Sequence, residues 1–130
     1  MPDSTVAMEF DARPEQLGMV RALTRVLALQ LELALDEAAD LELAVHEVGT
    51  ALVAIAAPGA VVRCEYRSRA TTIGVLVSST TVIAPRTTGL GWHIVRTLAS
   101  NLTVDCVPDD PQHTVIVGFN WARPLGWNHL

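Results

Sequence analysis

The sequence contains no lysine. All nine of its basic residues are arginines, which excludes proteins whose chemistry requires a lysine side chain. These are the phosphate-loop NTPases, the enzymes that form a Schiff base, and the protein kinases that hold ATP with a lysine on a strand. A nucleotide, if the chain binds one, must be held by another route.

Cysteine is scarce as well, with only Cys64 and Cys106 in 130 residues. Two cysteines are too few for a disulfide scaffold, so buried free thiols are favoured over a bridge. The four histidines are His46, His93, His113 and His129. No two of them lie at a helical ligand spacing with a third ligand nearby, so we expect no metal site.

Charged residues make up only 18% of the chain, and the formal net charge is -5. An acidic protein is a poor candidate for binding nucleic acid through its phosphates, and a basic or mixed protein partner suits it better. Half of the residues are hydrophobic, so the chain is expected to fold. The longest apolar run, residues 48–57, is too short for a membrane span, and the first residues lack the pattern of a secretory signal. We therefore expect a soluble cytoplasmic protein of one domain, residues 1–130, with no membrane partner.

The hydrophobic periodicity changes along the chain. Residues 5–10 alternate like a strand, and two amphipathic helices are expected from residue 14 to about 35 and from about 41 to 57. Residues 61–69 and 71–77 are rich in β-branched side chains and predict a hairpin. Next come an expected loop (78–88), a helix (92–100), and a strand pair (102–107 and 114–120) around a turn at 108–111. The tail, residues 123–130, shows no usable pattern, and the tryptophans are too scattered for a stacking platform, so core or interface roles are favoured for Trp92, Trp121 and Trp127.

This order of elements predicts an α+β fold, a two-layer sandwich with three helices on one face of a mixed β-sheet. The other face of the sheet would be partly exposed to solvent. Alternating polar residues after position 60 would lie on that wet face: Arg63, Glu65, Arg67 and Arg69.

Glu47 is a carboxylate within an otherwise apolar stretch of the second expected helix, residues 41–51. Residues i and i+4 share a helical face, so Glu47 and Ala51 point the same way. A carboxylate in this setting could act as a general base or orient a water molecule. It could equally be a surface acid at the border of the apolar stripe.

Gly89 and Gly91 stand directly before the third expected helix. Such a pair allows a tight turn and close backbone approach, and the helix start offers free N–H groups and a positive dipole end to a phosphate. Glycines also cap helices for purely structural reasons, so this segment alone is weak evidence.

Together and in this order, the two segments resemble the anti-sigma-factor serine kinases of the GHKL ATPase superfamily, whose Bergerat fold also occurs in histidine kinases, DNA gyrase and Hsp90. The N box of that family is matched by Leu41, Ala44, Val45, Glu47 and Thr50. Its last glycine box is matched by Gly89, Leu90, Gly91, Ile94, Val95 and Leu98. The resemblance extends over about residues 5–120.

The resemblance implies that Glu47 is the catalytic carboxylate and that Thr88, Gly89, Leu90 and Gly91 form the phosphate-contacting turn. The chain also departs from the family. Ala51 replaces the asparagine that holds Mg²⁺, and residues 78–85 contain neither acid nor glycine where the family has an adenine-recognising Asp-x-Gly-x-Gly box. The lid between the glycine boxes is short. We therefore expect binding of ATP and Mg²⁺ to be weak or absent.

Two functions follow from the resemblance. The favoured one is an anti-sigma factor that acts in transcription regulation such as a stress response. It would sequester a sigma factor and be relieved by an anti-anti-sigma protein with a STAS domain. The alternative is an active ATP-dependent serine/threonine kinase that phosphorylates this antagonist. An unrelated α+β interaction domain is a third, weaker option, and the family resemblance suggests a homodimer.

Overall fold

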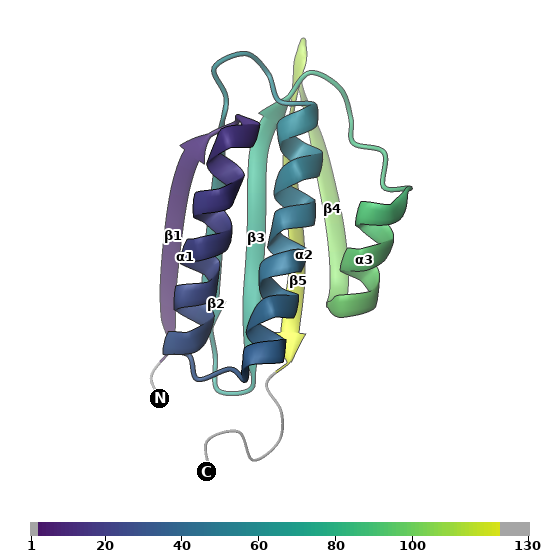
Figure 1. The fold of residues 1–130 in the computed structure, drawn as a ribbon. Coiled ribbons are helices and arrows are strands. Elements are labelled where there is room, and N and C mark those ends of the chain that lie inside the picture. The colour runs from purple at the N-terminus through teal and green to yellow at the C-terminus, as the bar shows by residue number, and fades with distance from the viewer. Residues whose placement is uncertain (1–2, 123–130) are drawn as a thin grey trace.

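The computed structural model describes residues 3–122, which form two layers (Figure 1). One layer is a five-stranded sheet, and three helices cover one of its faces. The strands are β1 (Ser4–Asp11), β2 (Val61–Ser68), β3 (Thr72–Thr81), β4 (Ser100–Asp109) and β5 (Gln112–Ala122). The helices are α1 (Leu17–Gln30), α2 (Leu35–Ala54) and α3 (Leu90–Leu98), with a 3-10 turn, η1 (Pro14–Gln16), before α1. The predicted α+β sandwich with helices on one face is confirmed.

The strand order is β1-β2-β3-β5-β4, and each neighbouring pair is antiparallel. The expected mixed sheet is therefore corrected to an antiparallel one. Two of the four pairs, β2–β3 and β4–β5, are hairpins, in which strands joined by a short turn must run in opposite directions. The pairs β1–β2 and β3–β5 are antiparallel across longer connections that contain the helices. The β4–β5 turn is tighter than predicted, since the strands pair as far as Asp109 and Gln112.

The boundary between the first two helices lies earlier in the chain than predicted. Helix α1 ends at Gln30 instead of near residue 35, because Glu32 adopts a positive φ of 63° and the Leu33 amide turns back to the Ala28 carbonyl. Helix α2 then begins at Leu35. Its first turn contains Asp36 and Glu37, and the Glu37 carboxylate accepts the Ala34 amide proton at 3.3 Å. Acids favour a helix start, so the acidic run belongs to the helix.

Strand β3 is longer than predicted. The expected loop at residues 78–88 is wrong for its first four positions, because Ser78–Thr81 pair with β5 as far as His113. Polar Ser and Thr conceal a strand from hydrophobic periodicity, but β5 still supplies the ladder partners. The remaining connection, residues 82–89, leads to α3, which begins at Leu90 and not at Trp92.

The core lies between the helices and the sheet. Alternate residues of β2 and β3 face it, including Val62, Val75 and Val77, each fully buried. Trp92 and Trp121 are also buried, which confirms their expected core role, whereas Trp127 and His129 lie outside the described residues along with the rest of the 123–130 tail. The single-domain expectation stays a prediction.

One polar pair is built into this core. The Thr24 hydroxyl lies 2.6 Å from the Tyr66 hydroxyl and donates its own proton to the Val20 carbonyl. Tyr66 must therefore be the donor to Thr24. Cys64 lies beside it on β2, and burial raises the pKa of its thiol to about 12 although a hydrogen bond with Tyr66 opposes the shift.

The two cysteines differ from the expectation in one respect. Both are free, as predicted, and Cys64 is buried, but Cys106 on β4 is exposed. The prediction of a buried Cys106 is wrong because β4 is an edge strand and its outer half extends beyond the helices (Figure 1).

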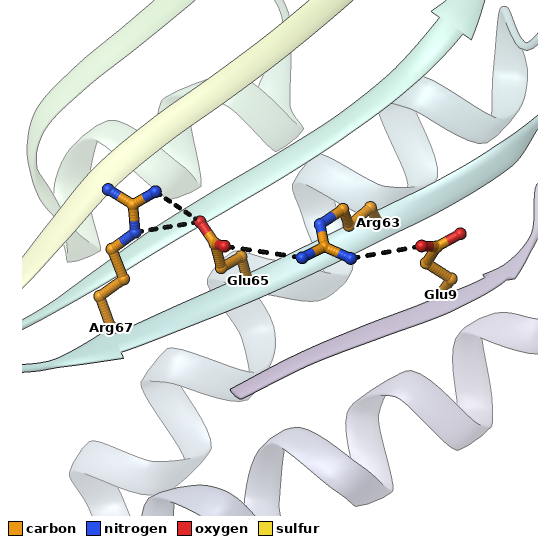
Figure 2. Close-up of polar contacts among 4 residues, drawn as sticks. All are labelled: Glu9, Arg63, Glu65 and Arg67. Atoms are coloured by element: carbon orange, nitrogen blue, oxygen red, sulfur yellow. Dashed lines mark hydrogen bonds and ion pairs between the residues drawn. The ribbon is translucent and has the colours of Figure 1, made fainter. Parts of the chain in front are cut away.

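The uncovered face of the sheet carries the predicted polar row (Figure 2). Arg63 reaches Glu9 on β1 at 3.2 Å and Glu65 at 3.6 Å, and Arg67 reaches Glu65 at 2.8 Å. Arg69 lies just beyond β2 and pairs with Asp3 at 3.6 Å. The arginines are about half exposed while Glu65 is only 18% exposed, and pairs that water still reaches add modest stability. None of the described helices has the length and apolar character that a membrane crossing needs.

Candidate functional site

Glu47 and Gly91 meet in space although 44 positions separate them in the chain. Helix α2 presents Glu47 half-buried toward α3, where Gly91 is the second residue. A methyl carbon built on Gly91 would lie only 2.7 Å from Glu47 Oε2. Position 91 therefore has no room for a side chain while the carboxylate keeps this place. The structure brings together the two segments that the sequence singled out.

The start of α3 is formed by Gly89, which adopts a positive φ of 100°. This conformation is one that glycine adopts without strain. Its carbonyl accepts the His93 amide proton at 3.1 Å, which begins the helix, but no side chain caps α3 and no acid stands in its first turn. The early N–H groups of a helix have no partner within the helix. The α3 start thus has the free amides that an anion site needs, but the negatively charged Glu47 carboxylate lies beside it.

Thr88 and Leu90 flank Gly89 and are both exposed. Leu90 is 74% exposed, so its side chain projects into solvent and makes no part of the core. The assignment of Thr88, Gly89, Leu90, Gly91 and Ala51 to the nucleotide site stays a prediction, as does the catalytic role of Glu47.

Ala51 lies one helical turn after Glu47 and packs partly buried against the core. Its methyl group offers no oxygen, and Mg²⁺ requires oxygen ligands. Within residues 3–122, no three His, Cys, Asp or Glu side chains gather closely enough to hold a metal ion.

Ser79 lies within residues 78–85, the segment where the resemblance would place an adenine-reading acid. This residue is buried on β3, and its hydroxyl donates to the Val61 carbonyl at 2.8 Å. The residues that follow are also hydrogen-bonded within the fold. Thr81 forms a β-bridge with Ala56, and the Val82 amide donates to the Ile55 carbonyl at 2.9 Å. The backbone groups at the end of β3 are therefore paired with the segment that follows α2, and they are not free to contact a ligand.

Sequence reasoning missed two features. The contact between Gly91 and Glu47 can be recognised only when α2 and α3 are packed, although the shared resemblance had already grouped them. Cys106 also lies with its Sγ 3.6 Å from His113 Nδ1. The hairpin register would have been needed to find that pair, because the two residues are diagonal neighbours on β4 and β5.

No family model matches the chain. The chain is 33% identical over 101 residues to the anti-sigma-F factor RsbW of Mycobacterium tuberculosis, from strains CDC 1551 / Oshkosh and ATCC 25618 / H37Rv. The match covers 75% of this chain and 59% of each relative. The chain thus spans less than two thirds of the length of the curated relatives it matches.

Proposed function

This chain is a distant relative of the anti-sigma-F factor RsbW, and on that premise we propose that it is an anti-sigma factor. It binds a sigma factor and keeps it from RNA polymerase in the cytoplasm. An anti-anti-sigma protein with a STAS domain releases the sigma factor by competing for the same protein. A homodimer is the proposed working form.

The similarity to RsbW is the observation that carries this proposal. A surface on α1 supports it. Met19, Leu23 and Val26 recur at helical spacing on the outer side of α1 and are 64%, 44% and 56% exposed. Apolar side chains grouped on a solvent face are typical of protein–protein contact surfaces. The net charge of -5 fits a partner with basic segments.

Weak or lost nucleotide binding is part of the proposal. Ala51 lacks an Mg²⁺ ligand, and Ser79 is buried with its hydroxyl already engaged. The Glu47 carboxylate stands beside the helix start where a phosphate would bind. An uncompensated carboxylate repels a phosphate, so this half of the site also binds anions poorly without a cation.

An active serine/threonine kinase that phosphorylates the anti-anti-sigma protein is the second candidate. The contact between Glu47 and Gly91 favours it, because it brings a candidate base to a helix N-terminus suited to phosphate. Binding remains the preferred function, since a base without metal and nucleotide contacts has little to act upon.

The proposal is tested by gel filtration with each sigma factor of the source organism. A stable complex is expected, and it should compete with core RNA polymerase. The double change Met19→Glu with Val26→Glu should abolish co-elution, whereas Val107→Glu, an equally exposed apolar position on β4, should not. Failure of the parent to co-elute with any sigma factor would reject the proposal.

A labelled-ATP assay separates the two candidates. With Mg²⁺ and the anti-anti-sigma protein present, transfer of phosphate to a serine or threonine should be absent or very slow. Robust transfer that disappears in Glu47→Gln would establish the kinase instead.

A further inference from the structure

The far end of the β4–β5 hairpin holds a thiol and an imidazole that the proposed function does not use. Cys106 Sγ lies 3.6 Å from His113 Nδ1, within hydrogen-bond distance for sulfur. Cys106 is exposed and His113 is half-buried. The hairpin projects beyond the helices at the end of the sheet where the connection to α3 begins (Figure 1). Small molecules in solvent can therefore reach the thiol.

The register of the hairpin fixes this pair. Cys106 pairs with Val115, and His113 pairs with Pro108 on one side and Thr81 on the other. Side chains two apart on a strand share a face, so Cys106 and His113 are diagonal neighbours on one side of the sheet. His113 is flanked by strands on both sides, which limits the positions its ring can take.

The charges around the pair come from β4 and the turn. Asp105 and Asp109 neighbour the pair along β4, but strand alternation directs both to the opposite face, and Asp110 lies in the turn. Within the described residues, no ion pair involves any of these three acids. The imidazole is the group in hydrogen-bond contact with the thiol.

We propose that Cys106 is a site of thiol–disulfide exchange with small disulfides, and that His113 activates it. The neutral ring, with its proton on Nε2, accepts the thiol proton at Nδ1. The Cys106 sulfur then forms a bond to one sulfur of the disulfide, and the S–S bond of the reagent breaks. The proton on His113 passes to the departing thiolate or, where the leaving group is a weakly basic aromatic thiolate, to water. Cys106 is thereby oxidised to a mixed disulfide, and half of the reagent is reduced to a thiol.

Cys64 provides the internal contrast. It is fully buried on β2, and burial raises its thiol pKa to about 12, so neither access nor ionisation favours its reaction. One chain therefore carries an accessible thiol beside a base and an inaccessible one without.

The experiment measures the rate at which the folded full chain reacts with an aromatic disulfide that releases a coloured thiolate. Oxidised glutathione with mass spectrometry identifies the residue that is modified. One thiol should react, and it should react about tenfold faster than the same thiol in the chain unfolded by guanidinium chloride, because a positioned base assists the proton transfer. Cys106→Ser should abolish this reaction, and Cys64→Ser should leave it unchanged.

His113→Gln tests the role of the imidazole. The rate at neutral pH should fall about tenfold toward that of the unfolded chain, and the pH profile of the rate should differ from that of the parent. Circular dichroism checks that the variant is folded. A rate equal to that of the parent in folded His113→Gln would overturn the proposal. If the variant does not fold, the parent protein alone tests the proposal. A reaction rate of the folded parent that is no greater than that of the unfolded parent also overturns the proposal.

Discussion

The two halves of the region that resembles a nucleotide site differ in how the chain fills them. At the α3 start, Glu47 and Gly91 keep a close contact, and the helix N-terminus has no side-chain cap. At the end of β3, Ser79 is hydrogen-bonded to Val61, and Thr81 is bridged to Ala56. We refer to these as the phosphate half and the base half. The first keeps the geometry that suits an anion, and the second uses its polar groups for the fold.

The difference supports the proposal that nucleotide binding is weak or lost, because the base half is occupied by regular secondary structure. Strand β3 continues where a glycine-rich turn would interrupt it, and the additional ladder and bridge hydrogen bonds satisfy backbone groups that a ligand could otherwise use. In the phosphate half, no side chain makes a capping hydrogen bond to the start of α3, although the Glu47 carboxylate lies close to Gly91.

The largest expected effect comes from Ser79→Asp, which returns an acid to the base half. Because Ser79 is 7% exposed, the carboxylate would be buried without a cation, and the free energy of unfolding should fall by about 3 kcal/mol or more. Urea unfolding at neutral pH measures this. Ser79→Ala, which removes only the hydrogen bond to Val61, should cost about 1 kcal/mol.

If Ser79→Asp proves as stable as Ser79→Ala and also binds ATP more tightly than the parent, the base half is open and the comparison fails. A smaller cost at acidic pH, where the new carboxyl is protonated, would support burial as its cause.

Alkaline pH tests how tightly the strands of the base half are packed. Cys64 pairs with Val77 on β3, and burial raises its pKa from 9.0 to about 12. A raised folded-state pKa gives stability that is complete below the unfolded pKa and is lost as pH rises toward the folded value. Between pH 9 and pH 10 the free energy of unfolding should therefore fall by about 1 kcal/mol from this group. Cys64→Ala should show a flatter decline, and equal slopes would mean that water reaches Cys64 in the parent.

A double-mutant cycle tests the contact in the phosphate half. Gly91→Ala places a methyl group 2.7 Å from Glu47 Oε2 and so must displace that carboxylate. In a Glu47→Ala background the same change meets no obstacle and should stabilise α3 by up to about 1 kcal/mol through helix propensity. Urea unfolding of the four proteins should give a coupling energy of about 0.5–1 kcal/mol. A coupling of zero would show that Glu47 does not lie against Gly91 in solution.

How much of this could be foreseen depends on the kind of signal. Local sequence patterns predicted the apolar face of α2, with Leu41, Val45 and Val48, and the glycines before α3. The family resemblance predicted that these two segments belong to one site. The Ser78–Thr81 strand was not, because polar residues reveal no period and only the partner strand β5 makes them a ladder. The helix boundary at residues 31–34 was also missed, because the local turn that ends α1 places Glu32, and not a glycine, at a positive φ.

The smallest expected effect concerns the charge of Glu47. Glu47→Gln removes the negative charge beside the α3 start while keeping the shape of the side chain. Affinity for inorganic phosphate should rise a few-fold, corresponding to about 0.3–1 kcal/mol for a charge near a helix terminus. Phosphate titration followed by NMR shifts of the Gly89 and Gly91 amides measures it, with Glu42→Gln, an acid on the α1 side of α2, as the control. Unchanged shifts in Glu47→Gln would remove the α3 start as an anion site.

Calorimetric titration of the unaltered full chain with MgATP tests most directly whether the site has lost its ligand. The closed base half and the missing metal ligand predict binding no tighter than about 1 mM, or about -4 kcal/mol. The buried Trp92, the residue after Gly91, should accordingly show little change in fluorescence. Saturable binding at low micromolar concentration, about -8 kcal/mol, would contradict the account, because the base half must then be open to nucleotide.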